Sequence, residues 1–473
     1  MTKIRRNELS SAPPNHDAES PNTYRSEVGL TLTLAAPIVV TQLAHISLSF
    51  VDTVMVGRLG PEALAGVALG NTVFFNTQIF CMGILMAVGP MVSQAFGAKD
   101  DDAIGRSVRQ GLWMTLTLSV FAFAIVFNGD KILALLGQTD KNVATAKGYL
   151  RAISWGVLPF LGFISLRSFL EAVSRPRIVT VIALTGVVVN IFMNYVLMFG
   201  KWGFPEMGLI GTGWASSAVF TFNFLVLLGY VAWQRDFRPY RIFSRLGKPD
   251  SHYFKELFRI GWPIGASLGV EMSLFMLTII MMGWLGTTQL AAHQIAVQCA
   301  AFTFMVPLGI GMASSVRVGQ EVGKKDLHGA SVAGFTGMGL SSVFMSGTAL
   351  LFWLTPLAIV SLYLALDEPQ NLPVIKMAVE LLAIAAIFQI VDGVQVAAMG
   401  ALRGMKDTRI PMLLSVISYW GVGLVTGYVL AFPLNMEEKG LWIGLVAGLA
   451  TAAVLLTRRF YRLSHFGTPG DLD

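Results

Sequence analysis

Two stretches of the chain resemble each other: residues 83–100 read GILMAVGPMVSQAFGAKD, and residues 309–326 read GIGMASSVRVGQEVGKKD. They are displaced by 226 residues, and both have Gly at the first position, Gln at the twelfth and Gly-x-Lys-Asp at the end. The same displacement aligns Pro37 with Pro263. Towards the C-terminus the displacement grows to 232, where a Gly-Leu pair recurs. The chain is therefore predicted to contain one structural unit twice.

The composition excludes a soluble protein. Of the 473 residues, 54% are apolar and only 13% are charged, whereas soluble domains carry about 25% charged residues. A disordered chain would need low hydrophobicity and high charge. Cys81 and Cys299 both lie inside apolar runs and give neither a disulfide framework nor a metal-ligand spacing. These features indicate an integral membrane protein.

The apolar runs predict twelve membrane-spanning helices, since a span needs about 20 apolar residues. The runs are continuous, unlike the short alternating segments of a β-barrel. The predicted spans are 28–56, 64–96, 105–128, 143–169, 177–199, 208–233, 254–284, 288–315, 330–358, 374–401, 410–432 and 440–460. Six spans per repeat bring the second copy in with the orientation of the first. The fold class is therefore an all-α membrane protein with two six-helix lobes, related by a pseudo-two-fold axis along the membrane normal, with a site between them.

The domain boundaries follow from the spans. We expect a polar tail at 1–27, an N-lobe at 28–234, an inter-lobe linker at 235–253, a C-lobe at 254–462 and a second tail at 463–473. The first tail is basic near its start, but no apolar segment follows directly, so a cleaved signal peptide is not expected.

The basic residues predict the orientation. Twenty-six of the 34 Lys and Arg residues lie on the side of the N-terminal tail and eight on the other side. By the positive-inside rule, both termini and the linker should be cytoplasmic. This distribution accounts for the net charge of +6 without a nucleic-acid partner; the expected partner is the lipid bilayer.

We expect nearly all of the 28 acidic residues in tails, in loops or near span ends, with three exceptions: Asp52 in span 1, Glu271 in span 7 and Asp392 in span 10. A carboxylate inside the membrane is costly and is a functional candidate; the alternative is a structural polar contact between helices. Glu271 lies about 21 Å from the outer end of its span at 1.5 Å per residue. Glu271 and Asp392 could share one cation, Na⁺ included, or one proton. No basic residue is expected in mid-span, which favours exchange of protons, Na⁺ or a cationic substrate.

Further polar side chains accompany these acids. Asn190 and Asn194 are four residues apart on one helix face and could bind a cation together with Asp52, since hard cations prefer oxygen ligands; hydrogen bonding between helices is the alternative. His45 shares a helix face with Asp52 and occupies the repeat position of Glu271. It is a switchable charge or a packing residue. Gln42, Asn71, Gln294 and Gln298 could line a cavity, with packing as the alternative; Gln294 is the candidate substrate contact among them.

Phe275 lies one turn from Glu271. An aromatic face beside a carboxylate suits a bulky cation, although a single Phe can equally be a packing residue. The sequence contains no P-loop, dinucleotide fingerprint or metalloprotease motif and no visible catalytic set. We expect neither an enzyme nor a cofactor, and the energy should come from an ion gradient or a partner protein.

Several motifs resemble the multidrug and toxic compound extrusion (MATE) family, most closely its NorM-type bacterial branch. They are VDTVMVGRLGPEALAGVALG at 51–70, GWPIGASLGVEMSLF at 261–275, AAHQIAVQ at 291–298 and VDGVQVAAMGALRGMKDT at 391–408. The resemblance implies a bacterial inner-membrane antiporter that exports organic cations, dyes and drugs in exchange for Na⁺ or H⁺. We expect a monomer that needs no ATPase subunit.

By position, the resemblance implies that Glu271 and Asp392 are the C-lobe cation-binding acids and that Asp52, Asn190 and Asn194 form the N-lobe polar cluster. Phe275 matches an aromatic residue beside the C-lobe acid in some members.

The resemblance leaves the coupling ion open. Some Na⁺-coupled members have Tyr one turn before the span 10 acid, where this chain has Phe388, so one possible oxygen ligand is absent. The alternative function is a lipid-linked oligosaccharide flippase of a related fold, whose groove should carry basic residues for a diphosphate. An intramembrane enzyme or receptor is a third class.

Overall fold

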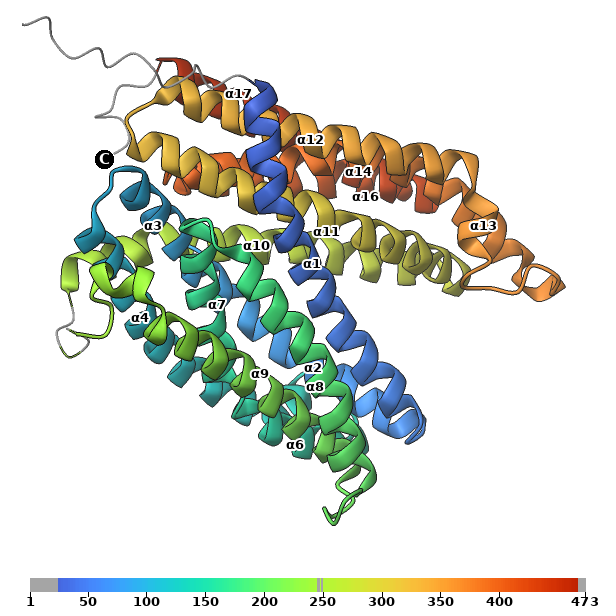
Figure 1. Cartoon of the computed structure of the whole chain (residues 1–473). Coiled ribbons are helices and arrows are strands. Elements are labelled where there is room, and N and C mark those ends of the chain that lie inside the picture. Colours follow the sequence, from blue (N-terminus) through green and yellow to red (C-terminus); the bar gives the residue numbers. More distant parts are fainter. Residues whose placement is uncertain (1–23, 245–246, 248–249, 467–473) are drawn as a thin grey trace, which may run out of the picture.

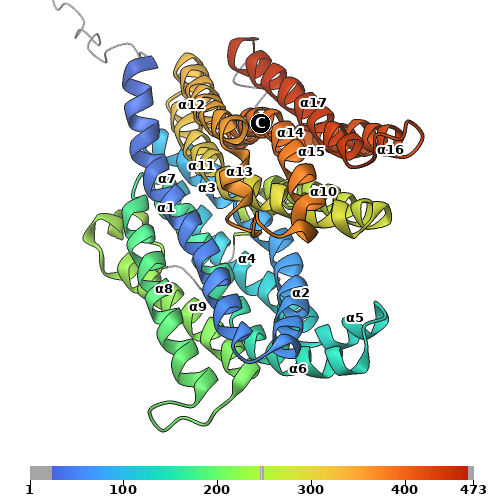
Figure 2. The same cartoon turned by 90° about the vertical axis from the view of Figure 1, so that its right-hand side faces the viewer.

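The computed structural model describes residues 24–244, 247 and 250–466. These residues form two helical bundles, the N-lobe (residues 24–240) and the C-lobe (residues 251–466), as Figures 1 and 2 show. In Figure 1 the N-lobe runs from blue to green and the C-lobe from yellow to red. Most of the predicted N-terminal tail, and residues 467–473 of the predicted C-terminal tail, lie outside the described residues.

The N-lobe consists of α1 (Tyr24–Gly57), α2 (Pro61–Leu85), α3 (Val88–Gly97), α4 (Asp101–Phe127), α5 (Gly129–Leu135), α6 (Asp140–Ser154), α7 (Val157–Ala172), α8 (Pro176–Phe199), α9 (Gly208–Trp233) and the 3₁₀ helix η1 (Arg235–Tyr240). The C-lobe consists of α10 (Ser251–Leu285), α11 (Thr287–Gly323), α12 (Leu327–Leu354), α13 (Pro356–Val360), η2 (Pro369–Asn371), α14 (Leu372–Gly404), α15 (Arg409–Val416), the π-helical η3 (Ile417–Leu424), α16 (Val425–Ala431) and α17 (Glu437–Phe466).

The predicted membrane spans are confirmed. Within the described residues, eleven helices are long and apolar enough to cross a membrane, and there are twelve if α6 and α7, which pass the same test together and are bent by 49°, count as one span. Gly156 lies in the break, and Pro159 lies in the first turn of α7. Proline has no N–H to donate to the carbonyl four residues earlier, so the helix loses one backbone hydrogen bond there and tends to bend or end.

The internal repeat is also visible in the helices. α2 and α3 together cover residues 61–97, and α11 covers 287–323, the same range displaced by 226. α6 and α7 together cover 140–172, and α14 covers 372–404, displaced by 232. The two lobes therefore have one helix plan, but the N-lobe copies of these two helices are broken and the C-lobe copies are continuous.

The first helix of each lobe crosses to the other lobe. α1 contacts α11 and α12 of the C-lobe as well as α8 of its own, and α10 contacts α2 and α4 of the N-lobe as well as α15 (Figures 1 and 2). We call the end of the molecule where α1 begins and α17 ends the termini side. The lobes meet there and diverge towards the opposite end, where α13 and the loop between α8 and α9 are far apart (Figure 1).

Glycines bring the lobes together on the termini side. A Cβ on Gly97 of α3 would lie 2.0 Å from the carbonyl oxygen of Gln320, and a Cβ on Gly323 of α11 would lie 2.0 Å from that of Gln94. The two contacts are exchanged by the repeat, and neither backbone could approach so closely with a side chain in place of the glycine.

The two glutamines add hydrogen bonds between the lobes. Gln94 Nε2 donates to the Gly404 carbonyl at 2.9 Å, and Gln320 Nε2 donates to the Ala172 carbonyl at 2.9 Å. Ala172 and Gly404 end the corresponding helices α7 and α14. The repeat thus places one such bond on each side of the pseudo-two-fold axis.

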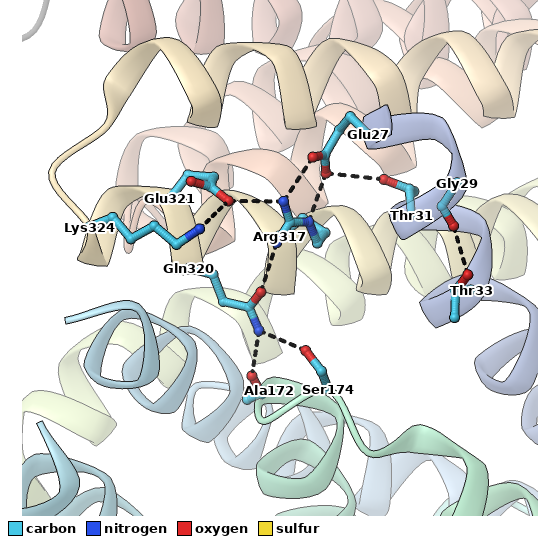
Figure 3. Close-up of polar contacts among 10 residues, drawn as sticks. All are labelled: Glu27, Gly29, Thr31, Thr33, Ala172, Ser174, Arg317, Gln320, Glu321 and Lys324. Carbon is cyan, nitrogen blue, oxygen red and sulfur yellow. Dashed lines mark hydrogen bonds and ion pairs between the residues drawn. The ribbon is translucent and has the colours of Figure 1, made fainter. Parts of the chain in front are cut away.

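A buried ionic network fixes the start of α1 to α11 (Figure 3). Arg317 donates through Nε and Nη2 to the two carboxylate oxygens of Glu27, both at 2.8 Å, and through Nη2 to Glu321 at 2.9 Å. Glu27 is fully buried, whereas the sequence placed it in the polar tail; α1 begins earlier, at Tyr24. The expectation that only three acids lie away from tails, loops and span ends as buried groups is therefore wrong, because Glu27, Glu171 and Glu321 lie in helices and are buried beside arginines.

Candidate functional site

Asp52 is the centre of a polar cluster in the N-lobe. Its Oδ1 accepts hydrogen bonds from Asn190 Nδ2 at 3.1 Å and Asn194 Nδ2 at 2.6 Å, and its Oδ2 accepts one from Ser216 Oγ at 3.1 Å. The two asparagines are one turn apart on α8, and Ser216 comes from α9. Helices α8 and α9 therefore supply the donors for one buried carboxylate on α1. The structure brings together Asp52, Asn190 and Asn194, which the sequence grouped.

This cluster borders a cavity of about 340 Å³ within the N-lobe. Asp52, Asn190 and Ser216 form part of its polar wall, beside Tyr149 of α6, whose hydroxyl donates to Asn71 Oδ1 at 2.6 Å. Its apolar wall is aromatic and contains Phe74, Phe75, Phe160 and Phe220. The cavity therefore combines one carboxylate and several neutral polar groups with a wall of aromatic rings.

His45 lines the same cavity, two turns before Asp52 on α1. Its ring packs edge-on against Phe163, with ring centroids 6.1 Å apart. Its Nε2 is buried and has no hydrogen-bond partner among the described residues. The ring is therefore packed, as one of the two interpretations expects, and its Nε2 is a buried polar atom that no described residue binds.

Glu271 and Asp392 line a second cavity, of about 420 Å³, in the C-lobe. Phe275 lies in the same wall and contacts Phe388, with ring centroids 6.2 Å apart; Phe388 in turn contacts Trp442 at 5.5 Å. The predicted pair of acids and the predicted aromatic residue therefore share one cavity. Phe388, where some relatives have Tyr, is a buried member of this aromatic group.

Asp392 differs from Asp52 in its hydrogen bonding. Asp392 is buried and its Oδ1 has no partner among the described residues, and the same is true of Gln395 Oε1 in the same cavity wall. A buried polar atom without a partner costs free energy, so this wall favours a ligand that supplies a positive charge or a donor.

Basic side chains also reach the cavity walls, which corrects the expectation of none in mid-span. Arg167 lines both cavities and forms a buried ion pair with Glu171, Nε to Oε1 at 2.7 Å. Arg403 lines the C-lobe cavity near the end of α14. The sequence counted both among the basic residues at span ends, but the bend between α6 and α7 and the packing of α14 place them inside.

The two cavities are neighbours and share a wall. Gln42 of α1 and Arg167 of α7 line both, together with Ile79, Met82, Ile164, Met305 and Leu308. This shared wall contains residues of both lobes, so a relative movement of the lobes would change both cavities at once.

Gln294 lies outside this arrangement. It is exposed on α11 and lines neither cavity, while its neighbour His293 is buried against Trp442 at 5.7 Å between ring centroids. Gln42, which the sequence did not distinguish from Gln294, lines both cavities. Among the residues missed, the Arg167–Glu171 pair had a signal, namely opposite charges four residues apart in an apolar run; Ser216 had none.

The oxygen atoms near Asp52 are suitable for a hard cation. The carboxylate, the Ser216 hydroxyl and the Asn194 Oδ1, which is buried and without a partner among the described residues, are the kinds of ligand that Na⁺ shares with other hard cations. Within the part of the chain that the structure describes, no group of three or more His, Cys, Asp or Glu side chains could hold a metal ion. Any bound cation would therefore depend on one or two carboxylates plus neutral oxygens.

The family comparison agrees with the repeat. The MatE family model matches residues 37–196 and 263–429, one segment in each lobe, and the two segments begin 226 residues apart. A probable multidrug resistance protein NorM of Mesorhizobium japonicum is 40% identical over 450 residues, which cover 95% of this chain and 96% of that protein. Its counterpart in Brucella suis is 39% identical over 447 residues, covering 94% and 95%.

Solved structures match the whole fold. The crystal structure of the eukaryotic MATE transporter AtDTX14 superposes with a TM-score of 0.82 at 19% identity, covering 95% of this chain and 100% of that one. A crystal structure of MATE in the bent conformation gives a TM-score of 0.84 at 16% identity, covering 94% and 98%.

Proposed function

Because the chain belongs to the MatE family of multidrug efflux transporters, we propose that it is a secondary active antiporter that exports organic cations in exchange for Na⁺ or H⁺. The observation that supports this most is the pair of neighbouring cavities, each with a buried carboxylate, Asp52 in one and Asp392, beside the half-buried Glu271, in the other. Such carboxylates attract cations strongly, because little water screens the charge there.

The C-lobe cavity is the proposed substrate site. Glu271 and Asp392 would balance the charge of the substrate, and the ring of Phe275 would contact its apolar or aromatic part. Flexible methionines suit substrates of many shapes. Those that line this cavity are Met82, Met86, Met272, Met305, Met312 and Met399. His45, across the shared wall, is proposed as a further substrate contact, whereas the exposed Gln294 is not.

The coupling ion is proposed to compete with the substrate. Na⁺ or H⁺ would bind at Glu271 and Asp392, or at Asp52 with Asn190 and Asn194, and neutralise the carboxylates that hold the organic cation. A ligand shifts a conformational equilibrium only through its different affinity for the two states. Exchange thus requires that ion and substrate prefer opposite lobe arrangements.

The membrane placement is also proposed. With 26 basic residues on one side and eight on the other, the termini side would be cytoplasmic and the membrane the bacterial inner membrane. The lobes are in contact on that side, so the structure would correspond to a state that is closed to the cytoplasm. No ATPase subunit or cofactor is required in this scheme, and a monomer would suffice.

Efflux fits better than lipid-linked oligosaccharide transport. A diphosphate would need several free basic groups, and the cavity walls contain two arginines, Arg167 and Arg403, of which Arg167 is already paired with Glu171. The full-length relatives are named as multidrug resistance proteins. A lipid-linked oligosaccharide precursor should therefore fail to compete with ethidium for the purified protein.

Reconstituted vesicles provide the test. A Na⁺ gradient and a pH gradient are imposed in separate experiments. One of the two should drive ethidium transport, and the gradient that does so identifies the coupling ion. Glu271→Gln and Asp392→Asn should reduce gradient-driven transport by more than about tenfold, the effect of losing about 1.4 kcal/mol. Glu380→Gln is the matched control, since Glu380 lies on α14 with Asp392 but is an exposed partner of Lys439. Unchanged transport in both cavity variants would contradict the proposal.

A further inference from the structure

A large basic cavity lies on the termini side of the C-lobe. Its volume is about 1050 Å³, and its walls come from α10, α11, the start of α12, the α14–α15 connection and α17. The basic side chains in these walls are Lys255, Arg259, Lys325, Lys406, Arg409 and Arg459, against two acidic ones, Glu256 and Asp407. It is separate from the acid-lined cavities, with which it shares no lining residue.

Four of these cations have no acidic partner. Lys406 pairs with Glu256 and Arg459 with Asp407, both at 2.9 Å, which accounts for both acids. The other four basic side chains form no ion pair with any residue in the described ranges and are exposed. They are Lys255, Arg259, Lys325 and Arg409. The positive-inside rule explains why cations lie on this side, but not why three separate segments (α10, the α11–α12 connection and the start of α15) direct them to one cavity.

The repeat shows that this cavity is specific to the C-lobe. Its N-lobe counterpart contains Lys99, the repeat equivalent of Lys325, but measures only about 300 Å³. There the linker helix η1 fills the space: Tyr240 lines the cavity, and a Cβ on Gly105 of α4 would lie 1.9 Å from the Tyr240 carbonyl oxygen. Among the described residues, no segment fills the corresponding space in the C-lobe.

An apolar surface continues from the rim of the basic cavity. Ile410 lines the cavity, and Ile410, Leu413 and Ile417 are 39%, 54% and 56% exposed. They are three and four residues apart, so they lie on one face of α15 and the following turn. In a membrane protein this face contacts acyl chains. A basic cavity next to an acyl-chain surface fits an amphiphilic anion better than a free phosphate ion.

We propose that this cavity binds the headgroup of an anionic phospholipid, with the phosphate among Lys255, Arg259, Lys325 and Arg409 and the acyl chains along Ile410, Leu413 and Ile417. Basic pockets between membrane helices recognise phosphate-bearing headgroups in this way. The proposal is independent of the transported substrate and of the coupling ion.

The test uses the purified full-length protein in mixed micelles of phosphatidylcholine with increasing phosphatidylglycerol. Phosphatidylglycerol should raise the melting temperature in a saturable manner, and native mass spectrometry should detect a retained anionic lipid. Arg259→Gln with Arg409→Gln should weaken this binding by about fivefold for each cation removed. The matched control is Arg177→Gln with Arg238→Gln, which removes two exposed cations of the same side that do not line the cavity.

The comparison of the cavity variant with the control variant decides whether the lipid binds in this cavity. Weaker binding in the cavity variant but not in the control supports the proposal. Equal weakening in both, or no effect of phosphatidylglycerol on the wild type, overturns it. An equal stabilisation by inorganic phosphate alone would identify a soluble phosphate ligand and overturn the lipid assignment. If the arginine variant does not fold, Lys255→Gln with Lys325→Gln, at two other exposed rim positions, takes its place.

Discussion

At the scale of single residues, the buried carboxylates differ in what already binds them. Three donors hold the Asp52 oxygens, whereas Asp392 Oδ1 has no partner within the described chain. Asp52 is therefore held in a preorganised cluster, whereas Asp392 has a carboxylate oxygen that no described side chain binds. This difference gives the two lobes distinct roles despite their shared helix plan.

Asn194→Ala should lower the free energy of unfolding by about 1–2 kcal/mol, because it removes the shortest bond to a buried carboxylate. The effect should shrink in an Asp52→Asn background, where no charge is left uncompensated. Chemical unfolding in detergent measures both values. Thr185→Ala is the control on the same helix, since Thr185 is exposed and bonds only the Val181 carbonyl. Equal losses in both backgrounds would show that Asn194 does not act through Asp52.

Arg167→Gln should be more damaging than Arg167→Gln combined with Glu171→Gln. Both side chains of the native pair are about 5% exposed, and removal of one partner leaves a buried charge, at a cost of about 3–5 kcal/mol. The double variant removes that charge and should recover most of the stability. Melting temperatures of the single and double variants, measured in one detergent, test this order of stability. A double variant that is less stable than either single variant would contradict the prediction.

At the scale of helices, glycines set how closely the lobes can approach on the termini side. Gly97→Leu should disfavour the closed arrangement, because its Cβ alone would lie 2.0 Å from a backbone oxygen of α11. Gly89→Leu is a matched control on α3, where a Cβ meets nothing within 4 Å. Spin labels at the exposed Asp102 and His328, at the starts of α4 and α12, report the separation of the lobes. The Gly97 variant should shift the distribution to longer distances and the control should not; a shift in both would contradict the role of the contact.

The sequence predicted helices better than helix faces. Length and hydropathy located all twelve spans, and the four-residue spacing of Asn190 and Asn194 predicted that both reach one partner. Span helices are apolar all round, so hydropathy does not distinguish their inward face. For that reason Gln42 and Gln294 had the same expectation from the sequence, although only Gln42 of the two lines a cavity and Gln294 is exposed. The burial of Arg167 could not be predicted either, because it depends on the bend between α6 and α7.

At the scale of the whole molecule, the charge asymmetry predicts which end faces the cytoplasm. A fluorescent protein fused after α17 should fluoresce, and alkaline phosphatase fused there should be inactive. Phosphatase fused in the loop between α8 and α9, on the opposite end, should be active. Arg109, Arg167 and Arg317 are buried, but the remaining basic residues still favour this orientation. The reversed pattern of fusion activities would contradict it.

The proposed exchange requires an organic cation and the coupling ion to compete for the carboxylates of the C-lobe cavity. Ethidium binding to the purified protein, titrated against Na⁺ and against pH, measures this competition. One of the two ions should weaken binding to the wild type and to Glu380→Gln by about tenfold or more. The Glu271→Gln and Asp392→Asn double variant should lose both the tight binding and its dependence on the ion. A double variant that binds ethidium as tightly as the wild type, with the same dependence on the ion, would contradict the account.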